Sequence, residues 1–289
     1  MLKLLKESFR ITNDCIMLAI PLVLFMWILS FYLGYANKIV DSPQELILAA
    51  VTILFMAGAT FSGWFYTIKK GIEVSKGVYV LDKDRTKAIV SLFKLMPRGI
   101  GRYFLSFIGI FFIFKICGIG LYFLINIIGT NLIGAVYTPE QASTILTSTP
   151  QELIEFIGTL SAEQLVKLRL WNLLIFLTTT VFLFALMFWI PEIIYSTPNP
   201  FVALFKSIAK IFKRLKKSIC LFIILAILNT ITSIVSTFAL NHPLLYLSIM
   251  VLIFYYLIYS VVLIFSFYRE EFCETNIINN NGNENEQKA

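Results

Sequence analysis

Few side chains in this sequence have the chemistry that catalysis requires. The single histidine, His242, lies in the turn Asn241-His242-Pro243, a setting typical of a loop residue. The sequence contains no HExxH, GxSxG, Walker A or DxD motif and no recognisable pair of carboxylates. The cysteines lack the CxxC or Cys/His spacing of a zinc site, so we expect free thiols at Cys15, Cys117, Cys220 and Cys273. We therefore expect a protein that is not an enzyme and that holds no cofactor or metal.

Lys115 is the one strongly charged residue near the middle of a long apolar run. A lysine at the centre of a membrane helix costs about 2.5–3.5 kcal/mol, so a partner or a water-filled cavity is expected. The same run contains Asn126, and another run contains Asn229 beside several hydroxyl side chains. Two interpretations follow for Lys115, Asn126 and Asn229. They form a polar site or ion path, or they make hydrogen bonds between helices while Lys115 extends toward the membrane surface.

Basic residues are concentrated at 199–217. Asn199 suits a helix N-cap and Pro200 the first helical position. Apolar residues then recur at helical spacing, at Phe201, Leu204, Phe205, Ile208, Ile211, Phe212 and Leu215, and lysines occupy the other face. This pattern is typical of a helix that lies in the membrane interface, where each cation contributes about 1 kcal/mol near an anionic leaflet. The alternative is that the lysines only set the topology.

A second basic segment is predicted at 84–96, capped by Asp84 and ended by Pro97 and Gly99. Both segments would lie on the cytoplasmic side and bind anionic lipid or a protein partner. The residues expected to do so are Lys87, Lys94, Arg98, Lys206, Lys210, Lys213, Arg214 and Lys217. Glu192 precedes the second segment and is expected to pair with basic residues.

The composition is that of a membrane protein. Of the 289 residues, 58% are hydrophobic and 14% charged, whereas soluble domains carry roughly 25% charged residues. The net charge of +7 is spread between apolar runs and forms no single basic face, so nucleic acid is not an expected partner. Six runs have the roughly 20 residues that a span needs. We predict an all-α protein, one membrane domain over 1–269, with spans at about 14–36, 46–68, 103–128, 171–195, 218–240 and 244–268.

Charge bias orients these spans. With the N-terminus in the cytoplasm, nearly all of the 24 Lys and Arg residues fall in inside segments, and only Lys38, Lys167 and Arg169 fall outside. Both termini are therefore predicted to be cytoplasmic, in a bacterial cytoplasmic membrane. The tail 270–289 is rich in Asn and Glu and is expected to be disordered.

The outer loop 131–170 contains three matches to the capping box, in which a hydroxyl residue is followed three positions later by Glu or Gln. They predict three short helices, the last continuing into the fourth span, and they begin at Thr138, Thr149 and Ser161. In the second span, Gly58 and Ser62, and Ala59 and Gly63, form small-residue pairs that allow close helix packing.

Residues 185–265 resemble a known bacterial family. The run Trp189-Ile190-Pro191-Glu192-Ile193-Ile194-Tyr195, followed by Ala203-Leu204, Ser207 and a basic stretch, is similar to the membrane domain that precedes the catalytic domain in some glycerophosphodiester phosphodiesterases, and to its stand-alone six-span relatives. We find no counterpart of that catalytic domain's histidine and carboxylate set, so the resemblance implies no activity.

Three functions follow as hypotheses. The first is a non-enzymatic membrane-organising or scaffold protein that binds anionic lipid or a cytoplasmic protein through its basic helices. The second is a transporter or exporter with a polar site around Lys115. The third is a membrane anchor subunit of an enzyme complex. The sequence does not define an oligomeric state.

Overall fold

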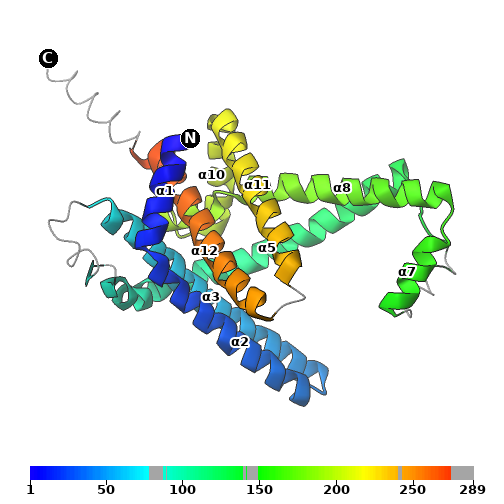
Figure 1. Cartoon of the computed structure of the whole chain (residues 1–289), viewed down its shortest axis with the longest axis horizontal. Helices are drawn as coiled ribbons and strands as arrows, with labels where there is room; N and C mark the ends of the chain where they lie inside the picture. The colour runs from blue at the N-terminus through cyan, green and yellow to red at the C-terminus, as the bar shows by residue number, and fades with distance from the viewer. Residues whose placement is uncertain (78–86, 89, 139–140, 142–148, 240–242, 275–289) are drawn as a thin grey trace. The chain divides into compact units, whose positions relative to one another are not determined.

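The structure is a computed structural model of the whole chain, and it describes all residues except 78–86, 89, 139–140, 142–148, 240–242 and 275–289 (Figure 1). The described residues form helices and no strand. Six helical segments among them are long and apolar enough to cross a membrane, namely Ile16–Ala36, Pro43–Ser75, Leu92–Leu132, Ala162–Tyr195, Leu215–Thr237 and Ser248–Cys273. The predicted all-α class and the six apolar helices are confirmed. His242 lies outside the described residues.

The chain divides into two compact units. The first combines Met1–Phe111 with Leu186–Ala289, and the second is Phe112–Ala185. One boundary falls within the long helix α5 (Met96–Leu132), and the other falls at the end of α8 (Ala162–Leu186).

The first unit contains seven α-helices among the described residues besides the first part of α5. These are α1 (Leu2–Asp14), α2 (Ile20–Ile39), α3 (Pro43–Ser75), α9 (Trp189–Tyr195), α10 (Pro200–Lys213), α11 (Leu215–Ala239) and α12 (Pro243–Tyr268). A 3₁₀ turn at Ile16–Ala19 joins α1 to α2, and a π-helical turn at Arg269–Glu274 extends α12. Helices α2 and α3 lie side by side, as do α1 and α12 (Figure 1).

Small residues bring α3 and the first part of α5 together. A Cβ on Gly63 would lie 2.7 Å from Cγ of Met96, and one on Gly58 would lie 2.8 Å from Cδ1 of Ile108. Side chains at these positions would push the helices apart. The prediction that the small residues of the second span serve helix packing is confirmed for both glycines.

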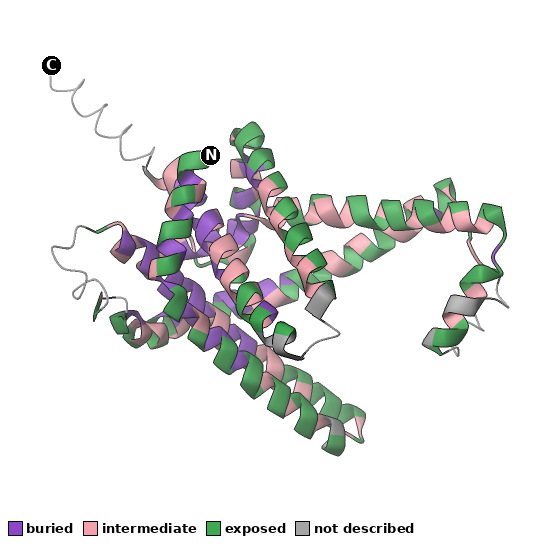
Figure 2. Ribbon diagram, in the orientation of Figure 1, coloured by how far each residue is buried: buried purple, intermediate pink, exposed green. Residues whose placement is uncertain are grey.

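Contacts of aromatic side chains fill the interior of the first unit. The ring of Phe65 stacks on Phe107 at 5.6 Å and on Phe265 at 5.9 Å. Trp64 is buried, and its Nε1 donates a hydrogen bond to the carbonyl oxygen of Leu18 at 2.8 Å. Buried residues therefore concentrate in the middle of this unit, while outer faces of its helices are exposed (Figure 2).

The second unit contains the rest of α5, the short helix α7 (Pro150–Gly158) and α8. Glycine allows a close approach here too, because Gly129 of α5 lies against the indole ring of Trp171 of α8. Trp171 Nε1 donates to the carbonyl oxygen of Gly134 at 3.0 Å, and Gly134 adopts a positive φ of 82° that favours glycine.

All three predicted capping boxes are present. The hydroxyl at each cap accepts from the backbone three residues on, with N–O distances of 3.3 Å at Thr138, 3.4 Å at Thr149 and 3.2 Å at Ser161. The third box opens α8, so the last loop helix continues into the fourth span as predicted. Residues 142–148 of the first predicted loop helix lie outside the described residues.

Three predicted boundaries differ from the structure. Pro97 and Gly99 lie inside α5, which begins at Met96 directly after a 3₁₀ turn at Leu92–Leu95. Proline is compatible with a first helical turn, where its missing N–H has no helical partner to lose. The second basic helix ends at Lys213, so Leu215 opens α11. Residues 270–274 continue the last helix, while the rest of the predicted tail lies outside the described residues.

Candidate functional site

The candidate site lies where the short helix α9 meets α10. Asn199 caps α10 as predicted, because its Oδ1 accepts from the backbone N–H of Phe201 at 3.0 Å and of Val202 at 3.3 Å. Trp189 Nε1 donates to the carbonyl oxygen of Pro200 at 2.8 Å. Residues 189 and 200 are thereby tied together, which sets the start of α10 beside α9.

Helix α10 has three different faces. One face is buried and consists of Ala203, Leu204, Ser207 and Ile211. A second face is apolar but exposed, with Phe205 at 70% and Phe212 at 68% of full exposure. The third face carries Lys206, Lys210 and Lys213. The apolar stripe expected from the sequence is therefore divided between residues that pack against the protein and phenylalanines that face outward.

Glu192 of α9 is fully buried and is the centre of a charged cluster. Its Oε2 accepts a hydrogen bond from Lys210 Nζ at 2.7 Å and another from the hydroxyl of Tyr268. Lys210 Nζ also lies 4.6 Å from the centre of the Tyr268 ring. Among the described residues Glu192 Oε1 has no hydrogen-bond partner. The predicted pairing of Glu192 with a basic residue is confirmed. Tyr268 was not predicted, because nothing in an apolar run near the chain's end distinguishes it.

A basic groove of about 340 Å³ opens beside this cluster. It is lined by Glu192, Ser196, Lys206, Ala209, Lys210 and Lys213. Glu192 balances the charge of Lys210, whereas Lys206 and Lys213 are exposed and form no ion pair within the described part of the chain. The groove therefore presents two uncompensated cations and a serine hydroxyl, a set that suits a phosphate or another anion.

The other predicted basic residues fall into two groups. Arg214 Nε lies 3.5 Å from Oε2 of Glu271, and Lys217 pairs with the same carboxylate. Their charges are thus partly compensated within the chain. Lys87, Lys94 and Arg98 are exposed, and Lys87 and Lys94 line a second groove of about 240 Å³ together with Val90 and Ser91. The residues predicted from 84 to 86 lie outside the described part.

The three predicted intramembrane polar residues do not form one site. Lys115 and Asn126 belong to the second unit, where Lys115 is exposed. Asn126 Nδ2 donates to the carbonyl oxygen of Tyr122 in its own helix at 2.9 Å. Eleven residues of α-helix separate Lys115 from Asn126, a rise of about 16 Å, so the two side chains are not neighbours.

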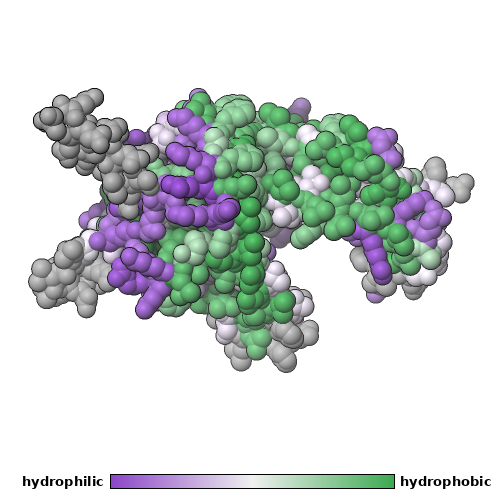
Figure 3. All heavy atoms as spheres, turned by 90° about the horizontal axis from the view of Figure 1, so that it is seen from above, coloured by the Kyte–Doolittle hydropathy of each residue, from purple (hydrophilic) through white to green (hydrophobic). Residues whose placement is uncertain are grey.

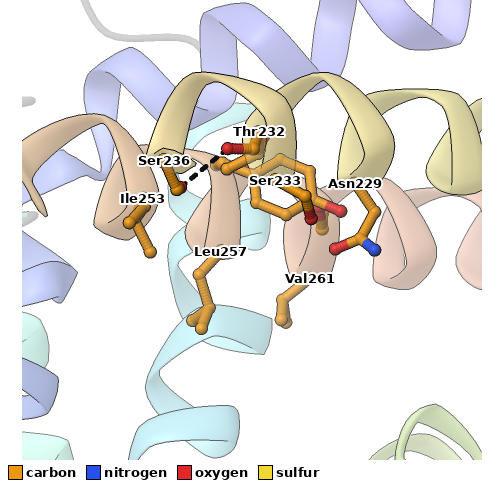
Figure 4. A pocket seen from close by; sticks show the side chains of 9 residues that line it. Asn229, Thr232, Ser233, Ser236, Ile253, Leu257 and Val261 are labelled. Carbon is orange, nitrogen blue, oxygen red and sulfur yellow. Dashed lines mark hydrogen bonds between the residues drawn. The ribbon is translucent and has the colours of Figure 1, made fainter. Parts of the chain in front are cut away.

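Asn229 belongs to the first unit and lines a groove of about 490 Å³ between α11 and α12 (Figure 4). Thr232, Ser233 and Ser236 of α11 face the same groove, opposite Leu257 and Val261 of α12. Thr232 and Ser236 satisfy their hydroxyls on carbonyl oxygens of their own helix, at 2.9 and 2.7 Å. Helix α11 thus lines the groove with polar side chains, whereas α12 adds Tyr256 and Ser260 to its apolar residues.

The fold defines a class of protein. Because six of its described helices are apolar and long enough to span a bilayer, the chain is a multi-pass membrane protein. Comparison with protein-family models, curated proteins and solved structures gave no match. The resemblance to the phosphodiesterase membrane domain therefore stays a prediction. In the described part of the chain no group of three or more His, Cys, Asp or Glu side chains is placed to hold a metal ion.

Proposed function

We propose that this protein is a non-enzymatic organiser of a bacterial cytoplasmic membrane and binds anionic phospholipid headgroups through its basic helices. The observation that carries the proposal is the arrangement of α10. Its buried face anchors it to the protein, its exposed phenylalanines suit the acyl chains, and its lysines suit the headgroups.

The exposed phenylalanines argue for a lipid neighbour. Large apolar side chains that stand as far out as Phe205 and Phe212 need an apolar surrounding to be stable. Lysines on the adjacent face keep their ammonium groups at headgroup level while their stems cover apolar surface. An anionic leaflet would attract Lys206 and Lys213 with about 1 kcal/mol each.

The distribution of charge supports the cytoplasmic side. Lys76 lies 3.1 Å from Glu7 and 3.3 Å from Glu270, so charged residues of α1, α3 and the end of α12 meet. Figure 3 shows hydrophilic residues gathered toward the left of the view beside a largely hydrophobic surface. Since positive residues near spans remain on the cytoplasmic side, this end of the first unit is assigned there.

The experiment that tests the proposal compares lipid selectivity of the purified chain in vesicles of phosphatidylcholine and phosphatidylglycerol. The Lys206→Gln, Lys213→Gln variant removes the two uncompensated cations and leaves the Lys210–Glu192 pair intact. We expect a clear loss of preference for spin-labelled phosphatidylglycerol, and a larger loss when Lys206 and Lys213 both become Glu, which also keeps the Lys210–Glu192 pair. A Lys38→Gln, Lys167→Gln variant, altered on the predicted outer side, is the matched control. Unchanged selectivity in the Lys206→Glu, Lys213→Glu variant would rule out the proposal.

A transporter remains the second candidate, and the groove at Asn229 is the observation that favours it. A polar strip in a membrane helix marks a path for solute or a partner for hydrogen bonding. Replacing Asn229 by Leu should abolish flux of a solute that uses this groove, with normal insertion. Retained phosphatidylglycerol selectivity in the same variant would separate the two candidates.

A further inference from the structure

Helix α1 is part of the packed first unit. Its inner face is buried and consists of Leu4, Ser8, Ile11 and Thr12. On the neighbouring helix α12, the hydroxyl of Tyr255 donates to Oδ1 of Asn13 at 2.7 Å, and its ring meets Phe9 edge-on at 6.0 Å. A basic sequence before a first span could serve topology alone, but that role requires no such fixed position.

A stripe of cations follows the outer side of α1. Lys3, Lys6 and Arg10 are spaced by three and four residues, which places them on one face of the helix. With Glu7, Phe9 and Asn13 they line a groove of about 630 Å³. Glu7 is engaged by Lys76 at 3.1 Å, whereas the three cations form no ion pair in the described part of the chain. The groove therefore has an uncompensated positive charge.

The faces of α1 and α10 follow the same order. At 100° per residue, both helices show in one rotational sense an exposed apolar face, a cationic face and a buried face. In α1 the exposed apolar residues are Leu2, at 83%, and Phe9, at 53%. In α10 they are the phenylalanines described above. Two helices far apart in sequence thus each present an exposed apolar face that suits acyl chains beside a cationic face that suits an anion.

We infer that α1 carries a separate binding site for an anionic phospholipid headgroup, with Lys3, Lys6 and Arg10 as its phosphate ligands. Asn13 closes one end of this site, and Phe9 and Leu2 contact the acyl chains beside it. The ligand class is that of the proposed function, but the residues are different, so the two can fail independently.

The test is a titration of the purified full chain with phosphatidylglycerol, followed by native mass spectrometry. The Lys3→Gln, Lys6→Gln, Arg10→Gln variant should weaken one binding event on the order of 100-fold, because each cation contributes a factor of about five. The charge-conserving variant Lys3→Arg, Lys6→Arg, Arg10→Lys should bind like the original chain. Phosphatidylcholine should show no difference between the variants.

The outcomes distinguish the two sites. Loss of one event in the α1 variant and of another in the Lys206→Gln, Lys213→Gln variant supports both. Loss only in the α1 variant supports this inference and contradicts the α10 site. Unchanged phosphatidylglycerol binding in a folded α1 variant, verified by an unaltered helical spectrum and melting temperature, would overturn the inference. If the α1 variant does not fold, Lys3→Gln with Lys6→Gln gives the same comparison with a smaller expected loss, about 25-fold.

Discussion

Different kinds of contact stabilise the interior of each of the two units. In the first unit a fully buried carboxylate, Glu192, joins α9 to Lys210 of α10 and Tyr268 of α12. In the second, the indole of Trp171 covers Gly129, and Phe114 meets Phe182 at 5.7 Å. The first unit thus adds a buried polar cluster to its aromatic core, whereas these contacts between α5 and α8 in the second unit are apolar.

The comparison of the two units changes which charged residue is identified as important for the structure. Lys115 has the more unusual place in the sequence, yet in the second unit its side chain is exposed. Glu192 is at the end of a span, where a charge is unremarkable, yet it is the one that is fully buried. The structurally important charge is identified by its burial and its hydrogen-bond partners, and not by its position within an apolar run.

The largest effect is expected from Glu192→Ala. The substitution leaves Lys210 and Tyr268 without their shared acceptor, and breaking a buried pair in this way costs about 3 kcal/mol. The lower end of the usual range applies because Lys210 keeps a quarter of its side chain exposed. The unfolding free energy in detergent, followed by circular dichroism during denaturant titration, measures the loss.

Two milder variants sharpen this result. Glu192→Gln keeps an acceptor for Tyr268 and should cost less than Glu192→Ala. Tyr268→Phe removes one donor and should cost about 1–2 kcal/mol. If all three variants had the unfolding free energy of the original chain, the polar cluster would not contribute to the stability of the first unit.

Gly129→Ala should destabilise the second unit by about 1–3 kcal/mol, because the new Cβ would overlap the indole ring of Trp171. Amide hydrogen exchange should accelerate in α5 and α8 near the substitution. The matched control is Gly120→Ala on the same helix, where a Cβ would meet nothing within 4 Å. That control should be neutral or slightly stabilising, since alanine is the better helix former. Equal effects at the two glycines would argue against the apolar contact.

Lys115→Leu should not lower the unfolding free energy and should raise it where lipid surrounds the span, because the side chain is exposed and a lysine there costs about 2.5–3.5 kcal/mol. The same denaturant titration checks this, with Arg169→Leu as the comparison at a second exposed cation of the same unit. A loss comparable to that of Glu192→Ala would show that Lys115 has a partner on which the unit depends.

The smallest effect concerns pH at α7. Hydrogen bonds from the backbone and hydroxyl of Thr149 lower the pKa of Glu152. The capping box therefore contributes above the ordinary glutamate pKa and is lost as the pH falls through the lowered value. Hydrogen exchange at the start of α7 should be faster at a pH below that value than near neutrality. Glu152→Gln, which removes the titrating carboxyl, should abolish the difference.

Local features of the fold were readable from the sequence. The capping boxes and the cap at Asn199 depend on residues two or three positions apart, and all of them formed as predicted. The close packing at Gly58 and Gly63 was also readable, because small residues four apart have few other uses in a membrane helix.

The contents of the candidate site were readable only in part. Helical periodicity predicted the cationic face of α10. It did not predict which apolar residues of this helix are buried against the protein and which are exposed, because both kinds have the same spacing. The sequence indicated only one of the two partners of Glu192. Lys210 was among the basic residues considered, whereas Tyr268 is brought in by tertiary packing from 76 residues away. The pairing of Arg214 and Lys217 with Glu271 has the same long-range origin.

Lys76 binds carboxylates from both α1 and the turn after α12. Helix α1 can thus meet α12 only once that later helix has been made, since the contact between Asn13 and Tyr255 spans 242 residues. Until then the inner face of α1, with Ile11 at its centre, has no α12 to cover it. A chain cut short before Pro243 would lack α12, and the contacts that α1 makes with Tyr255 could not form.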